Sequence, residues 1–111
     1  MKVAVIGSRT FSDYKLVKET LSTLNITLLV SGGATGADSL GEQYANSKEI
    51  PTKIFYPDWK KHGKKAGFLR NTDIINESEL IVAFWDGKSK GTLDSIKKAE
   101  ELNKNILIIK F

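Results

Sequence analysis

The apolar residues of this chain follow two patterns that alternate along the sequence. Short runs of aliphatic, often β-branched residues predict strands at residues 3–6, 26–30, 53–56, 80–84 and 106–109. The first, second and fourth of these runs are apolar on both faces, which is typical of the central strands of a parallel sheet.

Apolar positions at helical spacing separate the runs. The first helix would begin behind a Ser12 cap, with Asp13 in its first turn, and later helices would end near residue 46, span 68–76 and occupy about 93–102. Residues 56–67 are expected to form a long connection. This alternation predicts an α/β fold: a Rossmann-like single domain over residues 1–111, with a parallel sheet of about five strands and helices on both faces.

A glycine-rich stretch at residues 31–38 leads from the second strand into the second helix. Glycines let the backbone come close to a ligand, and a helix start offers unpaired N–H groups and a partial positive charge. The expected occupant is an anion, most often a phosphate. The alternative is a tight turn that binds nothing.

Two further loops should meet this stretch at the same edge of the sheet. Gly7, Ser8 and Arg9 follow the first strand, and residues 85–92 follow the fourth. In open sheets, ligands bind beyond the carboxyl ends of the strands, where the strand order reverses. Neither G-x-G-x-x-G nor G-x-x-x-x-G-K-[ST] occurs in the chain, which disfavours a standard NAD site and a Walker-type NTPase.

The composition further narrows the classes of protein and of binding site to which the chain can belong. The chain has 111 residues, no cysteine and one histidine, so we expect no disulfide, no thiolate metal site and no histidine-based metal cluster. The net charge of +4 permits anionic partners but does not by itself indicate nucleic acid. No apolar run is long enough for a signal peptide or a membrane span, so we expect no membrane partner and a cytoplasmic location.

Five motifs in order resemble the YspA group of the YpsA-related SLOG family. They are Val-Ile-Gly-Ser-Arg at residues 5–9, Ser-Gly-Gly-Ala-Thr-Gly-Ala-Asp at 31–38, Tyr-Pro-Asp-Trp at 56–59, Gly-Phe-Leu-Arg-Asn at 67–71 and Trp-Asp-Gly-Lys-Ser-Lys-Gly-Thr at 85–92. The wider superfamily has a Rossmann-like fold. It includes lysine-decarboxylase-like phosphoribohydrolases, the DNA-processing protein A family and proposed ligand-sensing domains, so the resemblance implies a nucleotide-like ligand.

The resemblance and the three loops together give a set of candidate ligand-binding residues. In the resemblance, Gly32, Gly33 and Gly36 match the phosphate-side turn, and Arg70 and Asn71 match an arginine–asparagine pair whose arginine contacts substrate. Trp59 or Tyr56 could stack a base, although core packing is the more frequent fate of an aromatic residue. The full set is Gly7, Ser8, Arg9, Gly32, Gly33, Ala34, Thr35, Gly36, Asp38, Trp59, Arg70, Asn71, Trp85, Ser89, Gly91 and Thr92.

The resemblance also bears on catalysis. Residues 89–95 align with the end of the phosphoribohydrolase signature P-G-G-x-G-T-x-x-E, but its glutamate falls at Ser95, and Asp94 would point about 100° away on a helix. Hydrolysis of an N-glycosidic bond needs a carboxylate. Asp38 or Asp86 would have to supply it, and the candidate catalytic residues are Asp38 and Arg70.

The basic run at residues 60–65 has three interpretations. It is a solvated loop, a mobile lid over a ligand's phosphates, or a contact for single-stranded nucleic acid beside Trp59. The function that we expect is binding of a nucleotide or nucleotide-derived small molecule, for sensing or sequestration, without metal or cofactor. The alternatives are a nucleoside 5′-monophosphate phosphoribohydrolase and a single-stranded DNA-binding module that binds nucleic acid weakly. A homodimer that shares one site is compatible with so small a chain.

Overall fold

Five parallel strands form one sheet in the computed structural model, which describes all 111 residues. The strands are β1 (Lys2–Gly7), β2 (Leu28–Ser31), β3 (Thr52–Ile54), β4 (Leu80–Trp85) and β5 (Asn105–Lys110). Their order across the sheet is β3-β2-β1-β4-β5, with every neighbouring pair parallel. The three strands predicted to be central, β1, β2 and β4, are the three inner strands.

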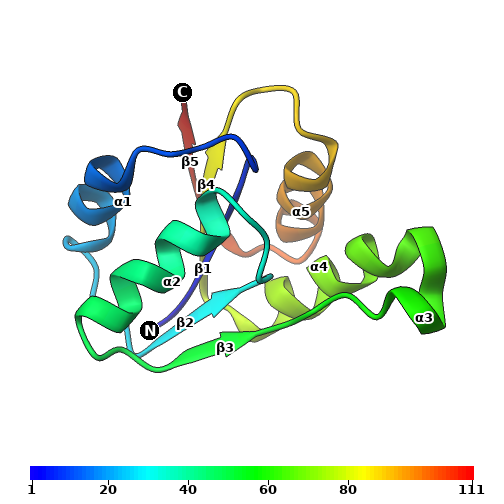
Figure 1. The fold of residues 1–111 in the computed structure, drawn as a ribbon, viewed down its shortest axis with the longest axis horizontal. Coiled ribbons are helices and arrows are strands. Elements are labelled where there is room, and N and C mark those ends of the chain that lie inside the picture. The colour runs from blue at the N-terminus through cyan, green and yellow to red at the C-terminus, as the bar shows by residue number, and fades with distance from the viewer.

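Helices cover both faces of this sheet (Figure 1). They are α1 (Tyr14–Leu21), α2 (Ala37–Ser47), α3 (Trp59–His62), the short 3₁₀ helix η1 (Gly63–Lys65), α4 (Ala66–Glu77) and α5 (Lys90–Glu101). One core lies under α1 and α2 and a second lies under α4 and α5. Alternate residues of β1 divide between them: Val3 and Val5 enter the first core, Ala4 and Ile6 the second.

The strand order reverses between β1 and β4. The chain builds outward from β1 through β2 to β3, and then crosses to β4 on the other side of β1. The loops that follow β1 and β4 therefore leave the sheet side by side and run in opposite directions. A crevice opens between such loops, and this is where open α/β sheets bind ligands.

Two local predictions were wrong in detail. Asp13, not Ser12, caps α1, because its carboxylate accepts the backbone N–H of Leu16 at 3.1 Å. Residues 56–67 are not one long connection, because they contain α3 and η1. Asp58 starts α3 by accepting the N–H of Lys61 at 3.1 Å, and Gly63 ends it at φ +57°.

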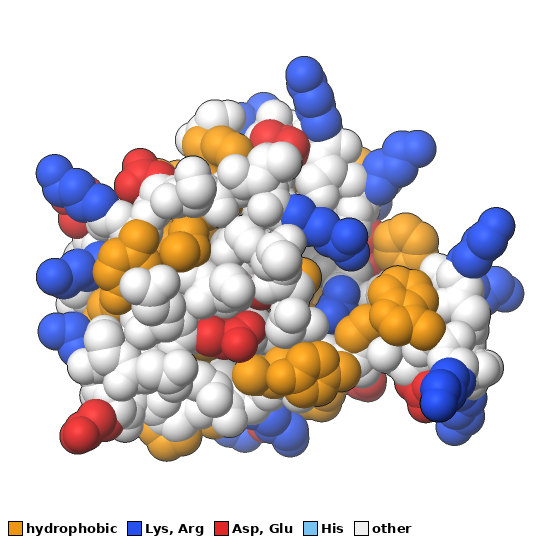
Figure 2. Space-filling model, in the orientation of Figure 1, with side chains coloured by type: hydrophobic (Ala, Val, Ile, Leu, Met, Phe, Trp, Pro, Cys, Tyr) orange, Lys and Arg blue, Asp and Glu red, His pale blue; other side chains and the backbone are white.

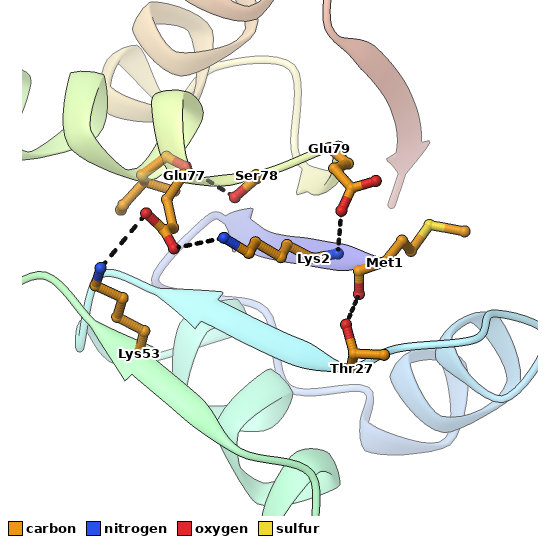
Figure 3. Close-up of polar contacts among 8 residues, drawn as sticks. Met1, Lys2, Thr27, Lys53, Glu77, Ser78 and Glu79 are labelled. Carbon is orange, nitrogen blue, oxygen red and sulfur yellow. Dashed lines mark hydrogen bonds and ion pairs between the residues drawn. The ribbon is translucent and has the colours of Figure 1, made fainter.

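Polar contacts hold the amino ends of the strands together, at the end of the sheet away from the crevice. Glu77, at the end of α4, forms ion pairs with Lys2 of β1 at 3.2 Å and Lys53 of β3 at 3.4 Å (Figure 3). The contact with Lys2 is the main cause of the lowered pKa of Glu77. Glu79 accepts the backbone N–H of Lys2, so the start of β4 is tied to the start of β1. No helix in the structure has the length and apolar character needed to cross a membrane.

Candidate functional site

Ser8 joins the three loops at the carboxyl end of the sheet. Its backbone N–H donates to the carbonyl of Phe84, and its carbonyl accepts the N–H groups of Phe11 and Ala37. Its hydroxyl oxygen accepts the N–H of Asp86 at 3.2 Å. The loop after β1, the start of α2 and the loop after β4 therefore meet at one buried residue.

The glycine-rich stretch needs two of its glycines for backbone reasons. Gly36 has φ +78°, and a Cβ there would lie 2.4 Å from the carbonyl oxygen of Ser8. Gly33 has φ +71°, and a Cβ there would lie 2.6 Å from Cε1 of Tyr56. Both positions therefore favour glycine on conformational and on steric grounds. The backbone N–H groups of Thr35 and Gly36 have no acceptor within the protein.

A cavity of about 410 Å³ lies at the reversal point of the sheet. The three loops and the facing sides of α4 and α5 form its walls, and most of the lining is polar. The lining residues are Ile6, Gly7, Ser8, Arg9, Thr10, Ala34, Asp38, Arg70, Asn71, Ile74, Asp86, Ser89, Gly91, Thr92 and Ser95.

A second cavity of about 350 Å³ adjoins the first. It lies between the glycine-rich stretch and the segment that leads into α3. Its lining residues are Arg9, Gly32, Gly33, Ala34, Thr35, Tyr56, Pro57, Trp59 and Arg70. Arg9, Ala34 and Arg70 line both cavities, so the two spaces adjoin at these residues.

Arg70 projects from α4 toward the glycine-rich stretch. Its guanidinium donates to the carbonyl of Gly32, at longer range to that of Phe55, and through Nε to the side chain of Asn71 at 3.1 Å. No carboxylate lies within 4.0 Å of it. Burial lowers the pKa of Arg70, and Asp38 opposes this effect from a greater distance. The half-buried cation is thus held in place without a neutralising ion pair.

Asp38 lies in the first turn of α2, on the same side of Gly32 as Arg70, because a Cβ on Gly32 would lie 2.9 Å from Oδ2 of Asp38 and 2.7 Å from Nη1 of Arg70. Its Oδ2 accepts the backbone N–H of Ala34 at 3.2 Å. Burial raises the pKa of Asp38 to about 6, despite the opposing effects of the Ala34 N–H and of Arg70. Asp38 does not cap α2, because the N-cap residue is Gly36 and has no side-chain cap hydrogen bond; the Asp38 carboxylate instead holds the glycine-rich stretch at Ala34, and its side chain lines the first cavity.

Asn71 connects α4 to α5 through hydrogen bonds of its side chain. Its amide nitrogen lies 3.4 Å from the carbonyl of Gly91 and 3.3 Å from the carboxylate of Asp94. Asp94 is also paired with Lys98 at 2.8 Å and does not line either cavity. Ser95, the position where the phosphoribohydrolase glutamate would fall, is buried and faces the first cavity.

The loop after β4 is ordered by its own side chains. Asp86 accepts the N–H groups of Lys88 and Ser89, both at 2.8 Å, and these contacts lower its pKa. Ser89 caps α5 and lies 3.2 Å from the hydroxyl of Thr92. Trp85 donates its indole N–H to the carbonyl of Ser89. The loop therefore presents hydroxyl groups to the cavity from a fixed helix start.

The structure brings most of the candidate residues together. Of the sixteen, all but Gly36 and Trp85 line one cavity or the other. Gly36 supports the turn, and Trp85 supports the loop after β4. Sequence reasoning did not single out Thr10, Ile74 or Pro57, because each becomes part of the lining only through tertiary packing. No cluster of histidine, cysteine, aspartate and glutamate side chains could hold a metal ion.

Known structures with this fold include DNA processing protein A (DprA). The DprA of Streptococcus pneumoniae superposes with a TM-score of 0.84 at 22% identity, over 99% of this chain and 50% of that one. The DprA of Helicobacter pylori, described with its single-stranded DNA-binding mode, gives a TM-score of 0.77 at 25% identity, over 97% of this chain and 64% of that one. The present chain thus spans half to two thirds of these DprA chains.

Two further comparisons rest on the amino-acid sequence rather than on the fold. The chain is 31% identical over 111 residues to the Gene 61 protein of Mycobacterium phage D29, an alignment that takes in 90% of this chain and 89% of that protein. The model of the YspA, cpYpsA-related SLOG family matches residues 1–62, which include β1, the glycine-rich stretch and α3. The chain belongs to the YspA, cpYpsA-related SLOG family.

Proposed function

We propose that the two adjoining cavities bind a nucleotide or a nucleotide-derived small molecule through its phosphate. One observation carries this proposal: both arginines of the chain, Arg9 and Arg70, line both cavities, and neither forms an ion pair. Two unpaired guanidinium groups at one place repel each other, and Arg9 contributes to the lowered pKa of Arg70. A bound anion would relieve this repulsion, and phosphate matches the donor geometry of arginine.

Groups near the two arginines could contact the phosphate, the ribose and the base of a nucleotide. Thr35, just before the start of α2, lines the second cavity, and its free N–H group offers a further donor to a phosphate. The first cavity holds hydroxyl and carboxylate groups, among them Thr92 and Asp38, which match the hydroxyl groups of a ribose. The second cavity ends at Trp59, whose exposed ring offers a stacking surface to a base.

Isothermal titration with a panel of mono-, di- and cyclic nucleotides and ADP-ribose tests the proposal. Arg70→Ala should weaken binding by about 10- to 100-fold, because one charge-assisted hydrogen bond contributes about 1.5–3 kcal/mol. Lys15→Ala is the matched control, since it removes one positive charge from an exposed position of α1 outside both cavities. A panel without any binder, or equal affinities for the Arg70→Ala and wild-type proteins, would refute the proposal.

Single-stranded DNA is a second candidate ligand, because an exposed aromatic residue adjoins both the second cavity and a basic surface. Trp59 is 55% exposed and Tyr56 is 71% exposed. Residues 60–65 add four exposed lysines beside them, and Figure 2 shows basic side chains projecting around this end of the molecule next to apolar surface. The fold shared with DprA proteins, one of them described as binding single-stranded DNA, supports this candidate.

Salt dependence separates the two candidates. A short basic surface should bind an oligonucleotide weakly and lose most of its affinity as salt rises, whereas a small nucleotide in the cavity should be less affected. Fluorescence anisotropy with labelled single strands, at two salt concentrations, measures this difference. Binding that survives physiological salt and is lost in a double Lys60→Ala, Lys61→Ala variant would favour the DNA candidate.

A further inference from the structure

The two edge strands of the sheet differ in length and in composition. At one edge, β3 has three residues, follows Pro51 and exposes Thr52 and Lys53. Short length, proline and lysine are features that keep an edge strand from pairing with another chain. At the other edge, β5 has six residues with the central sequence Ile106-Leu107-Ile108-Ile109 and contains no proline. It has β4 on one side and no strand on the other.

Apolar side chains are exposed on both faces of this second edge. Leu107 is 41% exposed, Ile108 42% and Phe111 50%. Residues alternate between the faces of a strand. Ile108 therefore lies on the same face as Ile106, which packs against the core under α4 and α5, whereas Leu107 shares its face with Ile109, which packs against the core under α1 and α2. Leu102, at 47%, adds exposed apolar surface at the end of α5.

The backbone groups that face outward can be assigned from the ladder. The N–H of Phe111 donates to the carbonyl of Trp85, so residue 111 faces β4. In a parallel ladder, both backbone groups of a residue point the same way, and the direction alternates along the strand. The N–H and carbonyl groups of Ile106, Ile108 and Lys110 therefore point away from β4, toward the open edge.

We propose that this edge pairs with β5 of a second copy of the chain, antiparallel and about a two-fold axis at Ile108. This register sets Ile108 opposite Ile108 of the second copy and Ile106 opposite Lys110 of the second copy. All of the outward residues then exchange both of their backbone hydrogen bonds, as the hydrogen-bonded pairs of an antiparallel ladder do. The two sheets join into one, and the exposed Leu107 and Ile108 side chains gain cross-strand neighbours.

Self-complementarity favours a second copy as the occupant, because an antiparallel copy sets Ile108 opposite Ile108 and Leu107 opposite Ile109. Charge then selects this register. No acidic residue occurs between positions 102 and 111, whereas lysines stand at 104 and 110. An axis at Lys110 would place two lysines face to face, which destabilises a strand pair. An axis at Ile106 would leave the outward groups of Lys110 beyond the strand of the second copy. The axis at Ile108 avoids both faults.

Light scattering coupled to size-exclusion chromatography tests the proposal. One chain has a mass of 12.3 kDa, and the wild-type protein should elute with about twice that mass. Ile108→Pro removes one outward N–H and leaves the ladder with β4 intact, because proline is tolerated where an edge strand's N–H faces solvent. This variant should elute as a single chain with an unchanged circular dichroism spectrum. Ile108→Val, which keeps the N–H, should remain a dimer.

A second variant keeps the test decisive if Ile108→Pro fails to fold. Ile108→Lys places like charges opposite each other at the axis and should also give a single chain. A wild-type protein that elutes with the mass of one chain at every concentration tested would overturn the proposal. So would a dimer that persists in both Ile108→Pro and Ile108→Lys. The edge lies outside both cavities, so this result is independent of the nucleotide titrations.

Discussion

Replacement of Asp38 by asparagine should change how the stability of the protein depends on pH. Asp38 is buried beside the glycine-rich stretch, and burial raises its pKa to about 6 from the ordinary value of 3.8. Well below pH 4, the carboxyl group is protonated in both the folded and the unfolded protein. Well above pH 6, it is ionised in both, but the folded protein holds the charge in a poorly solvated place. Ionisation therefore destabilises the fold.

The size of this effect follows from the difference between the two pKa values. A difference of about 2 units, at 1.36 kcal/mol per unit, corresponds to about 3 kcal/mol. Between pH 4 and pH 6, the folded protein binds more protons than the unfolded chain, so the contribution of Asp38 to the free energy of unfolding falls as pH rises. Asparagine does not titrate. The stability of Asp38→Asn relative to wild type should therefore increase by about 2–3 kcal/mol from pH 4 to pH 7.5.

Urea denaturation of both proteins at several pH values measures this quantity. The comparison between pH values removes any constant cost of the asparagine side chain, including its altered contacts with Ala34 and Arg70. Asp86→Asn is the matched control, because its carboxylate lines the same cavity but has a lowered pKa. Asp86 should contribute stability at neutral pH that is lost as pH falls through its folded pKa. A stability difference between Asp38→Asn and wild type that does not change with pH would refute the reasoning.

Three further results are expected. Gly33→Val should lose about 1–3 kcal/mol of stability and also nucleotide binding, because a β-branched residue would have to adopt φ +71° beside Tyr56; chemical denaturation and titration measure the two effects. Base release from AMP, GMP, CMP and UMP should be slow or absent by chromatography, because Ser95 supplies no carboxylate to the cavity, and robust turnover abolished by Asp38→Asn would contradict this. Glu77→Gln should lower the melting temperature at pH 7 but not at a pH below the folded pKa of Glu77, where the carboxylate of the wild type is also neutral.

The sheet was predictable because the composition of its inner strands indicates that they are buried on both faces. Val3–Ile6, residues 80–84 and residues 28–30 of the predicted 26–30 run contain no polar residue, and such composition is typical of a strand covered on both faces. The helices between them follow from their spacing, and the order of strands and helices leaves few topologies. The glycine-rich stretch predicted the edge of the sheet at which the cavities lie.

Details that depend on tertiary packing were not predictable. The sequence offers Ser12 and Asp13 equally as caps, and only the path of the chain after Phe11 decides between them. The helical character of residues 59–65 rests on the Asp58 cap, because such short helices carry no apolar periodicity. That Arg9 and Arg70 share two cavities, 61 positions apart in the chain, follows from the crossover between β3 and β4 and not from any local pattern.

Ser8 has a consequence for the motions of the site. Because its hydroxyl and its carbonyl accept amide N–H groups from two other loops, neither loop can separate from β1 without breaking a hydrogen bond to Ser8. Amide hydrogens of Ala37 and Asp86 should then exchange with solvent in a common opening event rather than at independent rates. A ligand that touches only one loop would slow exchange in all three. We therefore expect the reversal point of the sheet to open as one cooperative unit around Ser8.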